Sequence, residues 1–167
     1  KIKIHGLTAA AHKFHGPKGV GFMYIRKDKK IHPFLHGGSQ ERNMRGGTEN
    51  VSGIMGLAKA LEIAYRDMPE HIHHITGVKS HMIQRLRESI PGVDFHGDSS
   101  NLDKSLYTIL NVSLPESDEN EMVLFNLDLK GVSASGGSAC SSGASSGSHV
   151  LEALYPGSRR GAVRFSF

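Results

Sequence analysis

The sequence has few of the features that mark secreted, membrane-bound or disulfide-linked proteins. Its 167 residues include a single cysteine, Cys140, so no disulfide can form within the chain, and a lone thiol fits a reducing compartment. No apolar run approaches the ~20 residues that a membrane-spanning helix needs. The amino-terminal KIKIHGL lacks the apolar core of a signal peptide. These absences predict a cytoplasmic protein that has no membrane partner.

An excess of charge of one sign is also missing. The 20 Lys and Arg residues exceed the 16 Asp and Glu residues by only 4, and they are spread along the chain. This balance is too mild to indicate nucleic-acid binding. The hydrophobic fraction of 38% is that of an ordinary globular protein, and the length suffices for one domain or for parts of two.

Hydrophobic periodicity predicts a mixed α/β protein. Strands are expected at 1–7, 20–25, 106–114 and 161–167. Helices are expected at 51–67, 70–89, 119–129 and 149–155. Pro69 should break or kink the helical region, so we place a domain boundary there, giving domains 1–68 and 69–167. Because the chain begins and ends inside predicted strands, we expect it to be truncated at both ends.

The stretch AAAHKFHGPKGVGFMYI, residues 9 to 25, places His12, Lys13 and Lys18 among glycines. A glycine-rich turn with basic neighbours can cradle a phosphate, but GPKGVG lacks the spacing and the Ser/Thr of a P-loop. The alternative is a tight turn between two strands, in which glycine and proline serve backbone geometry and the lysines are solvated.

The only thiol lies in another glycine-rich stretch, SASGGSACSSGASSGSH. Cys140 has serine neighbours instead of the apolar neighbours of a buried structural cysteine. Such an exposed setting lets a thiolate attack and then move away. The alternative is a bystander cysteine in a linker.

Two further positions can bind a ligand. Arg164, within the apolar AVRFSF, either pairs with a buried acid or presents its planar fork to a ligand carboxylate. Thr48 follows two glycines in HGGSQERNMRGGTEN, a stretch that otherwise reads as a surface loop. The histidines near residue 73 lack metal-ligand spacing, so we predict no metal site.

Five stretches, in this order, resemble the pyridoxal-phosphate-dependent cysteine desulfurases of the iron–sulfur cluster assembly type, in the class V aminotransferase family. They are HKFHGPKGVGFMYI, HGGSQERNMRGGTEN, ILNVS, SASGGSACSSG and VRFSF. The resemblance covers nearly the whole chain, which corresponds to the C-terminal portion of a typical member. It implies the pyridoxal-phosphate transferase fold of type I: the end of the large domain, followed by the small C-terminal α/β domain.

The resemblance implies a role for each matching residue. Lys13 bonds covalently to pyridoxal 5'-phosphate as a Schiff base, and His12 contacts the cofactor. Thr48 reaches the phosphate bound by the neighbouring subunit of a homodimer. Cys140 takes sulfur from L-cysteine as a persulfide, releasing L-alanine, and delivers it to an acceptor or an iron–sulfur scaffold protein. Arg164 holds the substrate carboxylate.

The chain departs from the family at Ala10, where members commonly carry a phosphate-binding serine. The residues that stack on and pair with the cofactor ring lie upstream in the family, so we expect the fragment alone to be inactive. Alternative functions are a selenocysteine lyase or an aminotransferase of the same fold, or a non-catalytic module that binds a phosphate or a partner. The GGSACSSG pattern favours the iron–sulfur assembly group, which has a long mobile cysteine loop.

Overall fold

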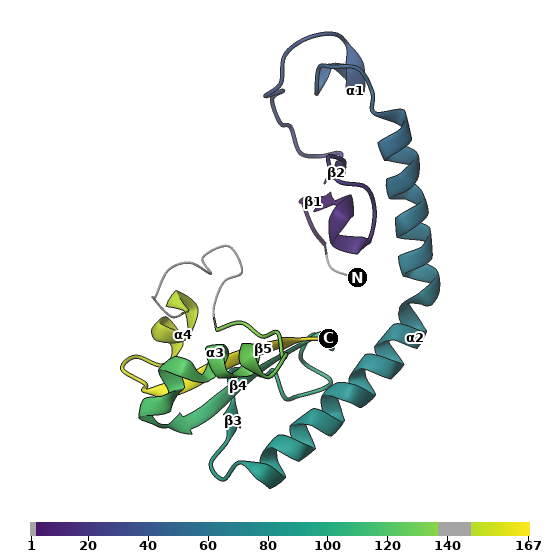
Figure 1. Cartoon of the computed structure of the whole chain (residues 1–167). Helices are drawn as coiled ribbons and strands as arrows, with labels where there is room; N and C mark the ends of the chain where they lie inside the picture. Colours follow the sequence, from purple (N-terminus) through teal and green to yellow (C-terminus); the bar gives the residue numbers. More distant parts are fainter. Residues whose placement is uncertain (1–2, 137–147) are drawn as a thin grey trace. The chain divides into compact units, whose positions relative to one another are not determined.

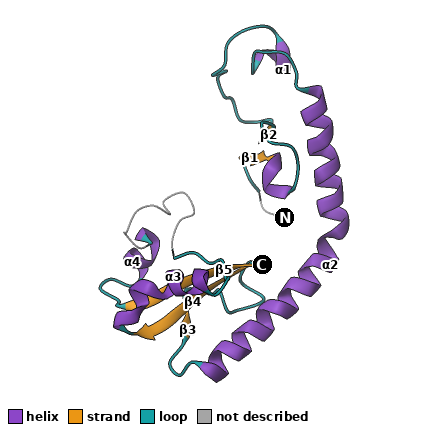
Figure 2. Ribbon diagram, in the orientation of Figure 1, coloured by secondary structure: helices purple, strands orange, loops and turns teal. Residues whose placement is uncertain are grey.

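The computed structural model describes residues 3–136 and 148–167. The chain divides into two compact units, Lys1–Pro69 and Glu70–Phe167 (Figure 1). Helices and strands are mixed (Figure 2), in agreement with the α/β class expected from the sequence. The assignment of residues 1–68 and 69–167 to a large and a small domain stays a prediction.

The first unit opens with an antiparallel hairpin. Strand β1 (Gly6–Ala10) pairs with β2 (Gly21–Ile25) in a register that runs from Gly6 opposite Ile25 to Ala10 opposite Gly21. A 3-10 helix, η1 (Ala11–Phe14), lies between them. The strand expected at 1–7 therefore begins later than its alternating pattern indicated, because pairing with β2 sets its limits. The strand expected at 20–25 is confirmed.

A single helix, α2 (Val51–Ser89), replaces the two helices expected from the sequence. Its start is capped by Asn50, whose Oδ1 accepts a hydrogen bond of 3.1 Å from the Gly53 backbone. Of the two effects expected at Pro69, a break or a kink, the break was wrong, because α2 continues through it. A proline inside a helix lacks one N–H donor and costs roughly 3 kcal/mol. Packing of the end of α2, where Ile83 lies in the core with Met82 and Leu86 against it, offsets part of that cost.

The second unit is built on a three-stranded antiparallel sheet. Strand β4 (Ile109–Glu116) lies between β3 (Asp94–Phe95) and β5 (Arg160–Ser166). One face of the sheet packs against the end of α2, and this cluster is the main core. The core consists of Ile83, Phe95, Leu110 and Val112, with Met82, Leu86, Val93, Leu114, Phe165 and Phe167 packed against it.

Short helices complete the second unit. The helix expected at 119–129 is divided into a 3-10 turn, η2 (Asp118–Met122), and α3 (Val123–Leu129). The last helix, α4 (His149–Leu154), begins at Ser148, whose hydroxyl accepts a hydrogen bond from the Leu151 backbone.

Candidate functional site

The residues His12 and Lys13 lie on η1, a turn that the backbone holds tightly. Ala11 is fully buried, and its N–H and C=O bond to Val20 O at 3.0 Å and to Gly16 N at 2.8 Å. A Cβ at Gly16 would lie 2.8 Å from that of Ala11, so the turn closes only around glycine. The side chains of His12 and Lys13 stay exposed. The turn thus presents a primary amine on a fixed backbone.

The same turn is packed against its surroundings at two further glycines. A Cβ at Gly21 would lie 2.5 Å from the Ala9 carbonyl oxygen, and one at Gly56, on α2, would lie 2.6 Å from Cγ of Pro17. Pro17 therefore rests on α2 at a place where no side chain intervenes. The glycines of this segment serve close backbone packing, which fixes the position of Lys13.

Thr48 lies on a loop that is also closed by glycine. Gly46 N donates to Leu35 O at 2.9 Å, and a Cβ at Gly46 would lie 2.8 Å from the Gly37 Cα atom. Gly47, with φ of 107°, then turns the chain toward Thr48, just before α2. Thr48 is exposed. The short element α1 (Gln40–Asn43) in this loop is a turn with left-handed backbone angles at its last three residues.

Arg164 lies on β5 in the second unit, and its side chain is half-buried. Its backbone exchanges two hydrogen bonds with Ser135, at 2.6 and 3.1 Å. Among the described residues the structure gives its guanidinium no carboxylate partner within 4 Å. Of the two roles left open for Arg164, pairing with a buried acid therefore lacks support.

The predicted residues are distributed over both units. His12 and Lys13 are neighbours on η1, Thr48 lies on a different loop of the same unit, and Arg164 belongs to the other unit. Cys140 lies outside the described residues.

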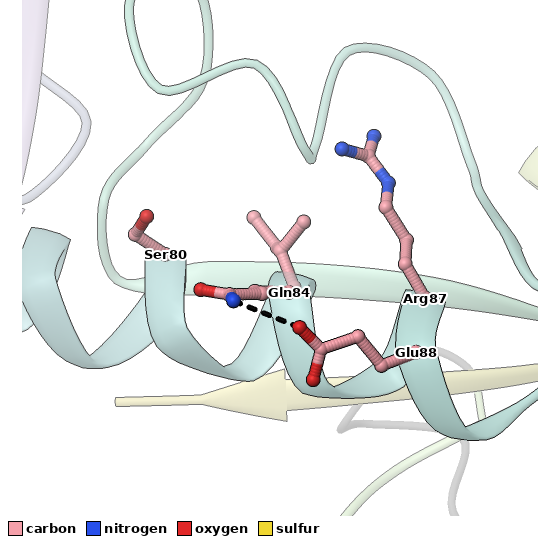
Figure 3. A pocket seen from close by; sticks show the side chains of 5 residues that line it. Ser80, Gln84, Arg87 and Glu88 are labelled. Atoms are coloured by element: carbon pink, nitrogen blue, oxygen red, sulfur yellow. Dashed lines mark hydrogen bonds between the residues drawn. The ribbon is translucent and has the colours of Figure 1, made fainter.

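Two hollows lie on the surface of α2 and contain none of these residues. One, of about 340 Å³, is shown in Figure 3, where Gln84 Nε2 donates to Glu88 Oε1 beside Ser80 and Arg87. The other is bordered by His73, His74 and His81. Because residues of α2 alone line them, neither has the concave, enclosed form of a ligand site. Within residues 3–136 and 148–167, no cluster suited to a metal ion and no helix able to cross a bilayer occurs.

Sequence reasoning missed a buried lysine in the second unit. Lys79 of α2 is completely buried, and its Nζ donates to Ser105 Oγ and Leu106 O, both at 2.8 Å. Burial lowers the pKa of Lys79 below its ordinary value. A lysine in an amphipathic helix ordinarily indicates a solvated face, so the sequence carried no signal for this contact.

A polar group on the sheet was missed as well. His96 Nδ1 lies 3.1 Å from Asn111 Oδ1, and its ring lies 5.2 Å from that of Tyr155. Asn111 is the residue opposite Arg164 on the neighbouring strand. The sequence separates these residues widely, and only the strand register shows that they are adjacent.

The whole chain, residues 1–167, matches the family model described as aminotransferase class V. The chain belongs to this family. Among curated proteins it is similar to "Cysteine desulfurase IscS" of Dictyoglomus turgidum, with 46% identity over 92% of this chain and 38% of the relative. It is likewise similar to "Cysteine desulfurase" of Gluconacetobacter diazotrophicus, with 39% identity over 99% of this chain and 41% of the relative. The chain thus spans about two fifths of the length of these relatives.

Solved structures agree with this assignment. A "NifS-like protein" superposes with a TM-score of 0.77 and 36% identity, over 99% of this chain and 41% of the other. A structure titled "SspA in complex with cysteine" superposes with a TM-score of 0.67 and 27% identity, over 98% and 44%. The family resemblance and the fold class inferred from the sequence are therefore confirmed.

Proposed function

We propose that this chain is the C-terminal portion of a pyridoxal-phosphate-dependent cysteine desulfurase, which converts L-cysteine to L-alanine and an enzyme persulfide. The observation that carries the proposal is the exposed amine of Lys13 on the closed turn η1. The proposal is supported by the family match and by the names of the similar proteins. The activity belongs to a longer protein, because the relatives are more than twice as long as the matched region.

The residues of η1 fit the aldehyde and phosphate of this cofactor in part. Lys13 supplies the exposed amine that attaches the aldehyde, and the neighbouring His12 ring is exposed beside it. When bound, pyridoxal phosphate withdraws electrons from the substrate carbon that carries the amine. Ala10, at the end of β1, offers no hydroxyl to the phosphate, so the fit is weaker there.

Two residues of the second unit act on the substrate in this proposal. Arg164 binds the carboxylate of L-cysteine through two parallel N–H donors, which orients the amino group. The Cys140 thiolate attacks the sulfur of the substrate: a sulfur–sulfur bond forms, the carbon–sulfur bond breaks, and the carbon takes up a proton to leave as alanine. The persulfide on Cys140 then passes its terminal sulfur to an acceptor thiol.

We further propose a homodimer, in which Thr48 contacts the cofactor phosphate of the neighbouring subunit, and a role in iron–sulfur cluster assembly with a scaffold protein as acceptor. A cytoplasmic location is supported by the single cysteine, which fits a reducing compartment. The exposed position of Thr48, at the end of a glycine-closed loop, is compatible with a contact to a second subunit.

The test uses the full-length protein that the gene encodes, purified with pyridoxal phosphate. Borohydride reduction followed by peptide mass analysis should find the cofactor on the peptide that contains Lys13. Lys13→Ala should lose both the covalent label and the visible absorption of the bound cofactor. The matched variant Lys18→Ala, a neighbouring exposed lysine, should keep both. A label that survives in Lys13→Ala would contradict the proposal.

A further inference from the structure

A row of four polar residues crosses the sheet of the second unit. Asn111 of β4 lies opposite Arg164 of β5, and Arg164 in turn bridges to Ser135. On the other side, His96 donates its backbone N–H to Asn111 O at 3.0 Å, directly after the pair Phe95–Val112. Directly opposed residues of antiparallel strands project from the same face. The row reads His96, directly after β3, then Asn111 of β4, Arg164 of β5 and Ser135, which bridges to β5 from outside the named strands. Figure 1 labels the three strands.

Asn111 and Arg164 form the more closely spaced of the two kinds of opposed pair that an antiparallel sheet contains. Arg164 donates its N–H to Ser135 O and accepts from Ser135 N, while Asn111 donates its N–H to Ser99 Oγ and accepts from His96 N. The backbone polar groups of both residues thus point away from each other, as in a non-hydrogen-bonded pair. Such a non-hydrogen-bonded pair has Cα atoms about 4.5 Å apart, with the side chains closer together than in a hydrogen-bonded pair. The side chains of Asn111 and Arg164 therefore start next to each other on the same face of the sheet.

His96 sets the orientation of the Asn111 amide. Oδ1 of Asn111 can only accept, so its 3.1 Å contact with His96 Nδ1 requires the hydrogen to lie on that nitrogen. The amide Nδ2, with its two hydrogens, is not used in this contact and is available to a ligand.

His96 is itself held in place from the end of α4. The Tyr155 ring stacks on the imidazole at a tilt of 48°, and the Tyr155 hydroxyl accepts a hydrogen bond of 3.1 Å from Gly97 N. Both His96 and Asn111 are half-buried. Contacts with Asn111 and Tyr155 restrain the His96 ring, which makes His96 suitable as a positioning residue.

We propose that Asn111 is a second binding residue for the carboxylate of the amino-acid substrate, and that His96 positions it. This rests on the proposed function, in which Arg164 holds that carboxylate. The Asn111 Nδ2 group and the Arg164 guanidinium are both donors, and the row contains no carboxylate of its own. Donors on neighbouring residues that have no carboxylate partner among the described residues suit a planar anion with two oxygens.

The test compares L-cysteine with cysteamine, which has the same thiol and amine but no carboxylate. The half-saturating concentration of each is measured from the visible spectrum of the full-length, cofactor-loaded enzyme. In Asn111→Ala, L-cysteine should bind about ten- to a hundredfold more weakly, as for a lost hydrogen bond to a charged group. Cysteamine binding should be unchanged. His96→Leu should reproduce part of this loss, and His96→Asn, whose Nδ2 stands in for Nδ1, should restore it.

A matched control is Asn120→Ala, which removes a half-buried asparagine that donates to Pro115 O at the other end of β4. Asn120→Ala should change the half-saturating concentrations of L-cysteine and cysteamine by the same factor, as a purely structural effect does. If Asn111→Ala also weakens the binding of both ligands by the same factor, the inference is overturned while the proposed function stays intact. Asn111→Ser serves for this comparison should the alanine variant not fold. A wild-type enzyme that shows no spectral response to L-cysteine would overturn both.

Discussion

At the residue scale, Ala10 is the position at which the family resemblance leads us to expect a phosphate-binding serine. It ends β1 directly before the turn that carries Lys13, and it is half-buried. Its methyl group offers no hydrogen bond to a phosphate oxygen. A neutral hydrogen bond contributes about 0.5–1.5 kcal/mol net, so the difference is measurable in cofactor binding.

We predict that Ala10→Ser tightens pyridoxal-phosphate binding about two- to tenfold, because the serine hydroxyl adds one hydrogen bond to the phosphate. The measurement is the cofactor dissociation constant of the full-length protein. Ala9→Ser is the matched control, since successive residues of a strand point to opposite faces. Equal effects of the two substitutions would show that Ala10 does not face the phosphate.

The buried Lys79 leads to a second prediction, on how the free energy of unfolding depends on pH. Because burial lowers its pKa below 10.5, there is an alkaline window in which the unfolded chain holds a proton that the folded chain lacks. The free energy of unfolding therefore gains a contribution that rises with pH across this window and is constant below it. Lys79→Met lacks this contribution.

The stability of the wild type relative to Lys79→Met should accordingly rise as pH increases toward 10.5. Urea unfolding of the full-length protein at a series of alkaline pH values measures it. Lys104→Met, which replaces an exposed lysine, should show no such trend. A difference between wild type and Lys79→Met that stays flat with pH would mean that the Lys79 pKa is not lowered in the folded protein.

At the element scale, substitutions at two glycines of α2 test the contact between α2 and Pro17, in the turn after η1. Gly56→Ala should destabilise the full-length protein by about 1–3 kcal/mol, because its Cβ would meet the rigid Pro17 ring at 2.6 Å. Gly77→Ala, in the same helix, meets no atom within 4 Å. It should instead stabilise by about 0.5–1 kcal/mol through helix propensity. Thermal unfolding of both variants measures the contrast, and destabilisation of similar size in both would refute this packing.

The elements also show where sequence reasoning reached its limit. The strand expected at 20–25 was found because its apolar run is flanked by glycine and charged turn residues. The break expected at Pro69 was wrong, because a rule about proline is local, whereas packing of an apolar face supplies most of the stability of a helix in a protein. The His96–Asn111 contact was missed because it depends on the register of β3 against β4, and register is a property of pairing.

At the scale of the whole molecule, apolar burial is unequal between the two units. The described core residues of the second unit include Leu110, Val112 and Val163, each at most 2% exposed, whereas Ala11 is the one buried apolar side chain described in the first. Phe34 is 92% exposed and Met23 60% exposed. We expect another domain or subunit of the full-length protein to cover part of this apolar surface. It agrees with a chain that spans about two fifths of its relatives.

The family and the fold class followed from the sequence because short motifs carry the chemistry: a lysine after a histidine, a cysteine among serines and glycines, and an arginine in an apolar strand. The roles of Lys13, Cys140 and Arg164 remain predictions. Their arrangement around one substrate depends on residues far apart in the chain, and motif order alone does not determine it.

The central claim, that the chain carries the sulfur-transferring half of a cysteine desulfurase, is tested most directly by mass analysis of the Cys140 peptide. The full-length, cofactor-loaded protein is mixed with L-cysteine, and alanine is quantified in the same sample. The account predicts one added sulfur atom on Cys140 together with alanine, and neither product in Cys140→Ser. Alanine formation by Cys140→Ser equal to that of the wild type, with no added sulfur on the wild-type peptide, would contradict it.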